Sequence, residues 1–172
     1  ATATINEIIE YESSINKSSS DKHIKTQFEI ASVCNDLRSR SKKIVFTNGC
    51  FDILHMGHVK YLEASKDFGD ILIVGLNSDL SVTTIKGVNR PINHELDRAY
   101  ILAALEVVDY VVIFNEVTPY ELIKTIQPNI LVKGGDYEGK SVVGEDIADE
   151  LKIVEFINGK STSILIENIK KR

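Results

Sequence analysis

Five short apolar segments alternate with amphipathic helical patterns along most of this chain, and this alternation constrains the fold more than any other feature. A short run that is apolar throughout is typical of a buried strand in a parallel sheet, where helices cover both faces. Such strands are predicted at residues 43–46, 70–77, 109–114, 129–134 and 152–157. The alternation therefore predicts the α/β class: a Rossmann-like, doubly wound, parallel five-stranded sheet with helices on both faces.

The segments between these strands carry the spacing and the capping residues of helices. Asn93 and Thr118 could each cap a helix, with Pro119 in the first turn of the second, and Ser161 could cap the last one. Helices are predicted at residues 26–40, 57–68, 93–108, 118–127, 145–151 and 161–172.

Residues 1–25 differ from the rest of the chain because they are polar and serine-rich, as linkers are. We expect them to be a linker or a tail, and residues 26–172 to form the folded domain. The net charge of −5 argues against general nucleic-acid binding, and no apolar run is long enough to span a membrane. Cys34 and Cys50 have no metal or redox spacing, which indicates a reducing cytoplasm.

Ligands of a parallel sheet bind beyond the carboxyl ends of its strands, so the segments that follow the strands are the first candidates for a site. The segment after the first predicted strand ends in His-x-Gly-His, formed by His55, Gly57 and His58 at the start of a helix. A helix N-terminus offers free N–H groups, imidazoles three residues apart can share a face, and glycine leaves room for a phosphate. The pattern therefore indicates a phosphate site. The other segments after strands are residues 77–90, 133–140 and 157–163.

Several motifs occur in the order seen in a known superfamily. They are GCFDILHMGH (49–58), LNSD (76–79), KGVNRPIN (86–93), ELDR (95–98), LVKGGDY (131–137) and GKSTS (159–163). Over about residues 42–172 the chain resembles the nucleotidyltransferases marked by HxGH, which include cytidylyltransferases and the much longer class I tRNA synthetases. The KMSKS loop of the synthetases is absent. Within this superfamily the sequence is most similar to the adenylyltransferases that make ADP-heptose.

The resemblance implies a reaction and its partners. Its substrates would be ATP and heptose 1-phosphate, and its product a precursor of the lipopolysaccharide core. It also implies Mg²⁺ bound mainly through the triphosphate, with no metal site made by protein ligands alone. Residues 1–25 resemble the tail of a sugar kinase that precedes this domain in many heptose enzymes, so we expect a heptose kinase in the same chain or pathway. Nucleic acid and membrane are not expected partners, and a homodimer is the commonest oligomer.

The candidate catalytic residues are His55, His58 and Lys86. The histidines suit donors to the triphosphate, and we interpret Lys86 and Arg90 as a mobile cationic clamp over the leaving pyrophosphate, in a loop with glycine and proline. Candidate nucleotide-binding residues are Gly49, Phe51, Asp52, Gly57, Asp136, Tyr137, Ser161, Thr162 and Ser163. Candidate phosphate or substrate contacts are Asn77, Asp79, Arg90, Arg98 and Lys133.

Several of these residues have a plainer interpretation. Phe51 suits a core as well as a ligand site, and Asp52 could orient a ribose, a metal or a histidine, or cap its own turn. Arg98 could bind phosphate or only pair with Glu95. The hydroxyls at 161–163 could simply cap a helix.

Other functions remain alternatives. A cytidylyltransferase acting on glycerol 3-phosphate or a similar small phosphate would carry the same histidines, and so would a nucleotide-binding module without catalysis. Residues 134–141 also match the P-loop pattern G-x-x-x-x-G-K-[ST], but Asp136 and Glu138 would place carboxylates where phosphate should lie. A dinucleotide oxidoreductase has no support, because G-x-G-x-x-G does not occur.

Overall fold

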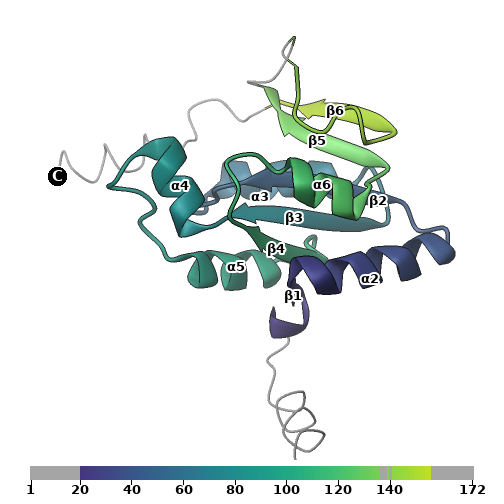
Figure 1. Ribbon diagram of the computed structural model, residues 1–172, viewed down its shortest axis with the longest axis horizontal. Helices are drawn as coiled ribbons and strands as arrows, with labels where there is room; N and C mark the ends of the chain where they lie inside the picture. The colour runs from purple at the N-terminus through teal and green to yellow at the C-terminus, as the bar shows by residue number, and fades with distance from the viewer. Residues whose placement is uncertain (1–19, 136–138, 140, 156–172) are drawn as a thin grey trace, which may run out of the picture.

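The residues described by the computed structural model, 20–135, 139 and 141–155, form a six-stranded parallel sheet with helices on both faces (Figure 1). The predicted fold class is confirmed. The sixth strand, which was not predicted, has two residues and pairs with β4 at one edge of the sheet. The strands are β1 (Ile24–Lys25), β2 (Ile44–Gly49), β3 (Ile71–Asn77), β4 (Tyr110–Phe114), β5 (Ile130–Gly134) and β6 (Glu150–Val154).

The strand order is β1-β4-β3-β2-β5-β6, so the chain runs outward from β2 in one direction and then crosses to the other side. The order reverses between β2 and β5, and the carboxyl ends of these two neighbouring strands meet at one edge of the sheet. In open α/β sheets this switch point is where ligands bind. The fold therefore directs attention to residues 48–58 and 133–135.

The two faces of the sheet are covered by different pairs of helices, because side chains of each strand alternate between the faces. On one face Val45 and Val74 pack with α3 (Met56–Lys66) and α5 (Glu95–Ala103). On the other face Phe46 and Ile73 pack with α2 (Gln27–Ser39) and α6 (Tyr120–Ile126). This two-sided core explains why the strands are apolar throughout.

The N-terminal end of the described chain joins the sheet. A short 3-10 helix, η1 (Ser20–Lys22), leads into β1, and α2 then begins with a capping box between Thr26 and Glu29, as the sequence predicted a helix from there. Ile24 and Lys25 pair with Val111 and Val112 of β4, so the ordered fold extends before residue 26.

Two predicted helix caps are wrong. α5 begins after His94 instead of Asn93, because the Asn93 side chain donates to the backbone oxygen of Asp52. The N-cap of α6 is Pro119, and Thr118 makes no capping hydrogen bond. The predicted helix 161–172 and its Ser161 cap lie outside the described residues.

Two other predicted elements also differ. The helix predicted at 145–151 is a series of turns, because its last two residues already belong to β6 and pair with β5. The helix predicted at 93–108 ends at Ala103, since the chain must then turn into β4, where the backbone N–H of Asp109 bonds to Leu72.

One helix in the site region was predicted as a loop. α4 (Asp79–Lys86) is capped by Ser78, whose hydroxyl accepts from the N–H of Ser81, and it ends at Gly87 with φ of 95°. Its sequence, DLSVTTIK, has β-branched residues that weaken the helical signal. No helix among the described residues is long and apolar enough to cross a membrane.

Candidate functional site

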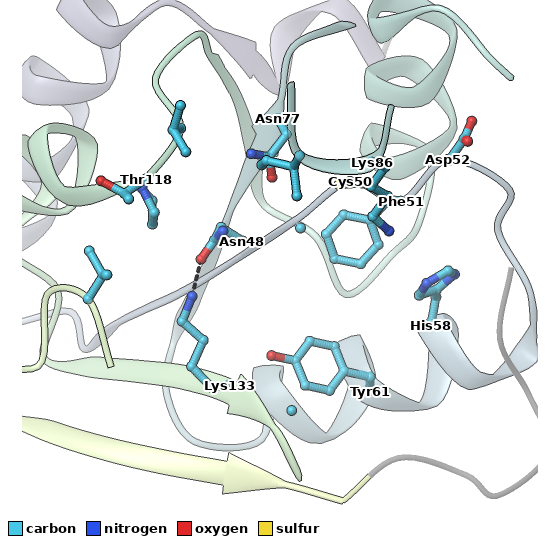
Figure 2. Close-up of a pocket in the computed structure, with 16 residues that line it drawn as sticks. Asn48, Cys50, Phe51, Asp52, His58, Tyr61, Asn77, Lys86, Thr118 and Lys133 are labelled. Atoms are coloured by element: carbon cyan, nitrogen blue, oxygen red, sulfur yellow. Dashed lines mark hydrogen bonds between the residues drawn. The ribbon is translucent and has the colours of Figure 1, made fainter. Parts of the chain in front are cut away.

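A cavity of about 410 Å³ lies at the carboxyl ends of β2, β3 and β5 (Figure 2). Its wall also includes the first turn of α3, the last turn of α4 and the loop between β4 and α6. This is the switch point of the sheet, and the volume is that of a small-molecule site. Seven of the predicted site residues border it: Gly49, Phe51, Asp52, His58, Asn77, Lys86 and Lys133.

The two histidines of the HxGH motif stack on each other at the start of α3. His55 is the N-cap residue and His58 lies in the first turn, and their ring centroids are 3.9 Å apart with an interplanar angle of 17°. His58 borders the cavity. The first turn of α3 has no acidic residue, so the positive end of the helix dipole is free for an anion.

His58 is held neutral by its surroundings. Burial lowers the pKa of His58 to about 4, and the nearby His55 and Lys86 add to this effect. Its Nδ1 is buried and has no hydrogen-bond partner among the residues that the structure describes. A neutral imidazole can donate one hydrogen bond, so His58 can offer its other ring nitrogen, Nε2, to a phosphate oxygen.

Asp52 anchors the following loop to the site. Its buried carboxylate accepts from Arg90 Nε at 2.6 Å, from the N–H of Ile92 at 2.8 Å and from the N–H of Asn93 at 3.0 Å. Both carboxylate oxygens are therefore engaged within the protein. Of the interpretations open for Asp52, local anchoring is the one that this geometry supports.

The interpretation of Arg90 as a mobile clamp needs correction. Its side chain is only 14% exposed, is ion-paired with Asp52 and does not border the cavity. Arg90 Nη2 is buried without a hydrogen-bond partner in the described part of the chain, so one nitrogen of the guanidinium remains for a ligand. Phosphate binding by Arg90 stays a prediction, but as a fixed group and not a moving one.

Two lysines from different elements border the cavity. Lys86 is the last residue of α4 and is exposed, which corrects its predicted place in a loop. Lys133 lies on β5, is 5% exposed and donates to Asn48 Oδ1 across the switch point (Figure 2). Together they make the cavity locally basic in an acidic protein, as an anionic substrate requires.

Arg98 is an internal cross-link and does not border the cavity. Its buried guanidinium donates to the backbone oxygens of Cys50 at 2.6 Å, Asn77 at 2.8 Å and Asn93 at 3.0 Å. It also donates to the Asp79 carboxylate at 2.8 Å. All three guanidinium nitrogens are thus bonded within the protein, so this geometry does not support phosphate binding by Arg98.

Asp79 does not border the cavity either. Burial acts to raise the pKa of Asp79, but hydrogen bonds from Arg98 and His94 outweigh it and hold the pKa below its usual range. Asn77 does border the cavity, and its side-chain amide donates to Ser81 Oγ at 2.9 Å. Gly57 is buried inside the first turn of α3.

The loop between β4 and α6 is the part of the site that sequence reasoning missed. Val117, Thr118 and Pro119 border the cavity, and so do Cys50 and Tyr61 from the β2 and α3 side. The rule about strand ends could have found the loop, because it follows the predicted strand 109–114 in the same way as the other segments. The candidates Asp136, Tyr137, Ser161, Thr162 and Ser163 lie outside the described residues.

The structure argues against two kinds of site. Within the described residues, no group of three or more His, Cys, Asp or Glu side chains could hold a metal ion. A P-loop at 134–141 would need a helix directly after it, and residues 143–149 form turns and bends instead. The P-loop alternative is therefore wrong.

Comparison with known proteins gives consistent matches along the chain. A family model described as cytidylyltransferase-like matches residues 46–171. The bifunctional protein HldE of Aliarcobacter butzleri is 65% identical over 99% of this chain and 36% of its own length. That of Nitratiruptor sp. is 61% identical over 99% of this chain and 37% of its own. The chain thus spans about a third of the length of these relatives.

Two solved structures share the fold. A lipopolysaccharide core biosynthesis protein from Thermoplasma volcanium has 31% identity and a TM-score of 0.56, with 69% of this chain and 99% of that one covered. A pantoate-beta-alanine ligase from Francisella tularensis has 19% identity and a TM-score of 0.59, covering 85% of this chain and 76% of the other. The second likeness concerns the fold alone.

Proposed function

The chain belongs to the cytidylyltransferase-like family of nucleotidyltransferases, and from this premise we propose that it transfers AMP from ATP to heptose 1-phosphate. The products are ADP-heptose and pyrophosphate. The observation that carries the proposal is the stacked pair His55 and His58 at a helix N-terminus, where His58 borders the same cavity as Lys86 and Lys133. Such an arrangement can bind a polyphosphate beside a second anion.

This reaction does not need a strong general base. An oxygen of the sugar 1-phosphate is already anionic, and it attacks the α-phosphorus of ATP. The bond between the α-phosphorus and the bridging oxygen breaks, and pyrophosphate leaves with its electron pair. The enzyme has to hold two anions in line and to stabilise the charge on the phosphates.

The two histidines and the two lysines each have a role in this proposed reaction. His58, neutral with one N–H to give, donates to a phosphate oxygen of ATP, while His55 keeps its ring in place by stacking. Lys86, exposed at the end of α4, neutralises the leaving pyrophosphate. Lys133, buried at the end of β5, holds the phosphate of the sugar beside Asn48.

Mg²⁺ accompanies the triphosphate in this proposal. The carboxylate of Asp52 is already bonded to Arg90, Ile92 and Asn93, so the cation would be held by phosphate oxygens and water. When bound, it adds positive charge that stabilises the leaving pyrophosphate.

The heptose substrate rests on the motifs and on the relatives. The two HldE relatives are named bifunctional, and this chain matches about a third of their length. That supports a second activity, a heptose kinase, in the remainder of such proteins. The Thermoplasma volcanium structure is named for lipopolysaccharide core biosynthesis, in keeping with a heptose product.

The remaining parts of the proposal concern the organisation of the chain. The boundary of the transferase domain would lie before Ser20, because η1 and β1 are part of the fold.

A reducing cytoplasm suits the two free thiols, of which the Cys34 thiol has its pKa raised to about 11 by burial. A homodimer is kept as a prediction from the general frequency of dimers.

A matrix of substrates tests the proposal. ATP, CTP, GTP and UTP are each combined with heptose 1-phosphate, glucose 1-phosphate and glycerol 3-phosphate, and pyrophosphate release is measured with Mg²⁺ present. We expect the highest rate for ATP with heptose 1-phosphate. CTP with glycerol 3-phosphate as the best pair would replace this proposal by the cytidylyltransferase alternative, and no release from any pair would indicate a binding module.

A further inference from the structure

We infer that Phe51 is a positioning residue for His58, and that Gly49 is glycine because the ring of Phe51 fills the space where its side chain would lie. The inference deepens the proposed function, because it concerns how the phosphate donor of that site is oriented. It assigns to Phe51 a role other than contact with the nucleotide.

The ring of His58 has aromatic neighbours, and its buried Nδ1 has no hydrogen bond within the described part of the chain. Phe51 meets His58 edge to face, with ring centroids 5.3 Å apart and an interplanar angle of 64°, and His55 stacks on His58 at 3.9 Å. Functional histidines are usually oriented by a hydrogen bond from the second ring nitrogen. Here Nδ1 of His58 is buried and has no partner among the described residues, so packing has to set the ring plane.

The backbone of Phe51 is held in an unfavourable conformation. Its φ of 44° lies in the left-handed region, which a bulky side chain rarely adopts. Such a conformation persists where the surroundings enforce it, and this often occurs at functional sites. The next residue, Asp52, provides the enforcement through its carboxylate bonds to the loop and through its backbone oxygen, which accepts from Asn93 Nδ2 at 2.7 Å.

Gly49 gives an independent sign that the position of the Phe51 ring matters. A Cβ at Gly49 would lie 2.9 Å from Cε2 and 3.3 Å from Cζ of Phe51, and the first of these distances is too short for carbon atoms. Phe51 is only 6% exposed and packs in the core cluster on the α3 and α5 face, so its ring has little room to retreat. A methyl group at position 49 would therefore displace the ring and alter its contact with His58.

The alternative is that Phe51 is an ordinary core residue whose loss only weakens the fold. Phe46 provides the matched control, because it is a fully buried phenylalanine on the same strand as Gly49 but packs in the other core cluster. Phe46→Leu should lower stability and leave the rate of the folded protein unchanged. Phe51→Leu should lower the rate as well.

The first test is kinetic and uses the whole chain. Misplacement of a reacting group by about 1 Å can cost about 100-fold in rate, so we expect Phe51→Leu to lower kcat by about tenfold or more. The KM for ATP should change by less than about twofold, because the groups that bind the phosphates remain. Gly49→Ala should also lower kcat, and it should add less than about twofold in the Phe51→Leu background, since the ring that it displaces is gone.

The second test does not depend on activity. Two-dimensional NMR of histidine-labelled protein follows the titration of His58, on which His55 and Lys86 also act. In Phe51→Leu the ring should become more accessible, and its pKa should move from about 4 toward the ordinary value of 6.5. A change in the His58 titration is also expected for Gly49→Ala, and none for Phe46→Leu.

The outcomes separate the claims. A wild-type chain that releases no pyrophosphate refutes the proposed function, while the NMR comparison still tests the contact between Phe51 and His58. Unchanged kcat in folded Phe51→Leu refutes the positioning role. A lower kcat with an unaltered His58 titration also refutes it, because Phe51 would then act on another group. If Phe51→Leu does not fold, Gly49→Ala decides by the same two measurements.

Discussion

His58 combines a partly buried ring, a stacked neighbour and a position at a helix N-terminus, and each of these properties bears on phosphate binding. We predict that His58→Ala lowers kcat by at least about tenfold while the fold survives, since loss of one such donor costs about 100-fold in other enzymes. Steady-state kinetics and circular dichroism measure the two effects. His94→Ala is the control, because His94 is 87% exposed and lies outside the cavity. Normal turnover in folded His58→Ala protein would contradict the assignment.

The same residue makes stability depend on pH. Burial holds the pKa of His58 at about 4 in the folded chain, whereas in an unfolded chain the pKa has its ordinary value of 6.5. As pH falls from 6.5 toward 4, the unfolded chain takes up a proton that folded His58 does not, so the free energy of unfolding decreases over this window. Above pH 6.5 both states are neutral at this position and the contribution is constant.

We therefore predict that His58→Asn, which cannot titrate, loses less stability than the wild type between pH 6.5 and pH 4.5. Urea unfolding at several pH values measures the slope for each protein. Parallel slopes for the two proteins would show that His58 is not held neutral by the fold.

At the scale of elements, α4 delivers Lys86 to the cavity. The helix is capped by Ser78, ends at Gly87, and leaves the lysine exposed at its last position. We predict that Lys86→Ala reduces kcat by about tenfold, because a cation at the developing charge of pyrophosphate is lost. Its free energy of unfolding should change by less than about 0.5 kcal/mol, since an exposed charge contributes little to folding.

Lys60 provides the control for Lys86. It is an exposed lysine on α3 that pairs with Glu63 and does not border the cavity, so Lys60→Ala should leave both kcat and stability nearly unchanged. Equal rates for the two variants would remove Lys86 from the proposed mechanism.

Arg98 ties together the ends of several elements that surround the cavity. One guanidinium bonds to backbone oxygens after β2, at the end of β3 and before α5, and to the carboxylate at the start of α4. We predict that Arg98→Ala costs about 3 kcal/mol or more, because it leaves the Asp79 carboxylate and three carbonyls without their donor. Denaturant unfolding measures this.

Arg40→Ala is the matched control for Arg98. Its ion pair with Asp36 is on the surface, with 68% of the arginine side chain exposed, so the cost should be below about 1 kcal/mol. A similar small cost for Arg98→Ala would mean that water or other donors replace the buried guanidinium.

The elements also show what the sequence could predict and what it could not. The strands β2 to β5 were predictable because each is apolar on both faces, and α2 because its capping box is local. β1 could not be predicted, since a strand of two residues has no periodicity and its pairing with β4 is a long-range contact. α4 was missed because β-branched residues weaken its local signal, while its cap and its packing below the cavity stabilise it.

The residues of the candidate site can also be divided into those that the sequence could predict and those that it could not. His58, Lys86 and Lys133 were predictable from motifs that follow strands, and the structure brings all three to one cavity. The roles of Arg90 and Arg98 could not be predicted, because the charge of an arginine does not reveal which buried groups it bonds to. Arg90 is held by Asp52, and Arg98 by oxygens far away in the sequence.

At the scale of the whole molecule, the strand order explains why distant motifs act as one site. The reversal between β2 and β5 brings residue 48 next to residue 133, and β3 adds residue 77 from the other side. A parallel sheet of this order forms the cavity only at its carboxyl edge. The cavity and the stacked histidines at its border suit the proposed transfer of AMP.

The most direct test of the central claim is mass spectrometry of two reactions with this chain alone. With ATP, Mg²⁺ and heptose 1-phosphate, we expect ADP-heptose and pyrophosphate in equal amounts. With heptose 7-phosphate in place of the 1-phosphate, we expect no product, because the attacking phosphate oxygen on the anomeric carbon is missing. The absence of any nucleotide sugar in the first reaction, or a heptose bisphosphate in the second, would contradict the account.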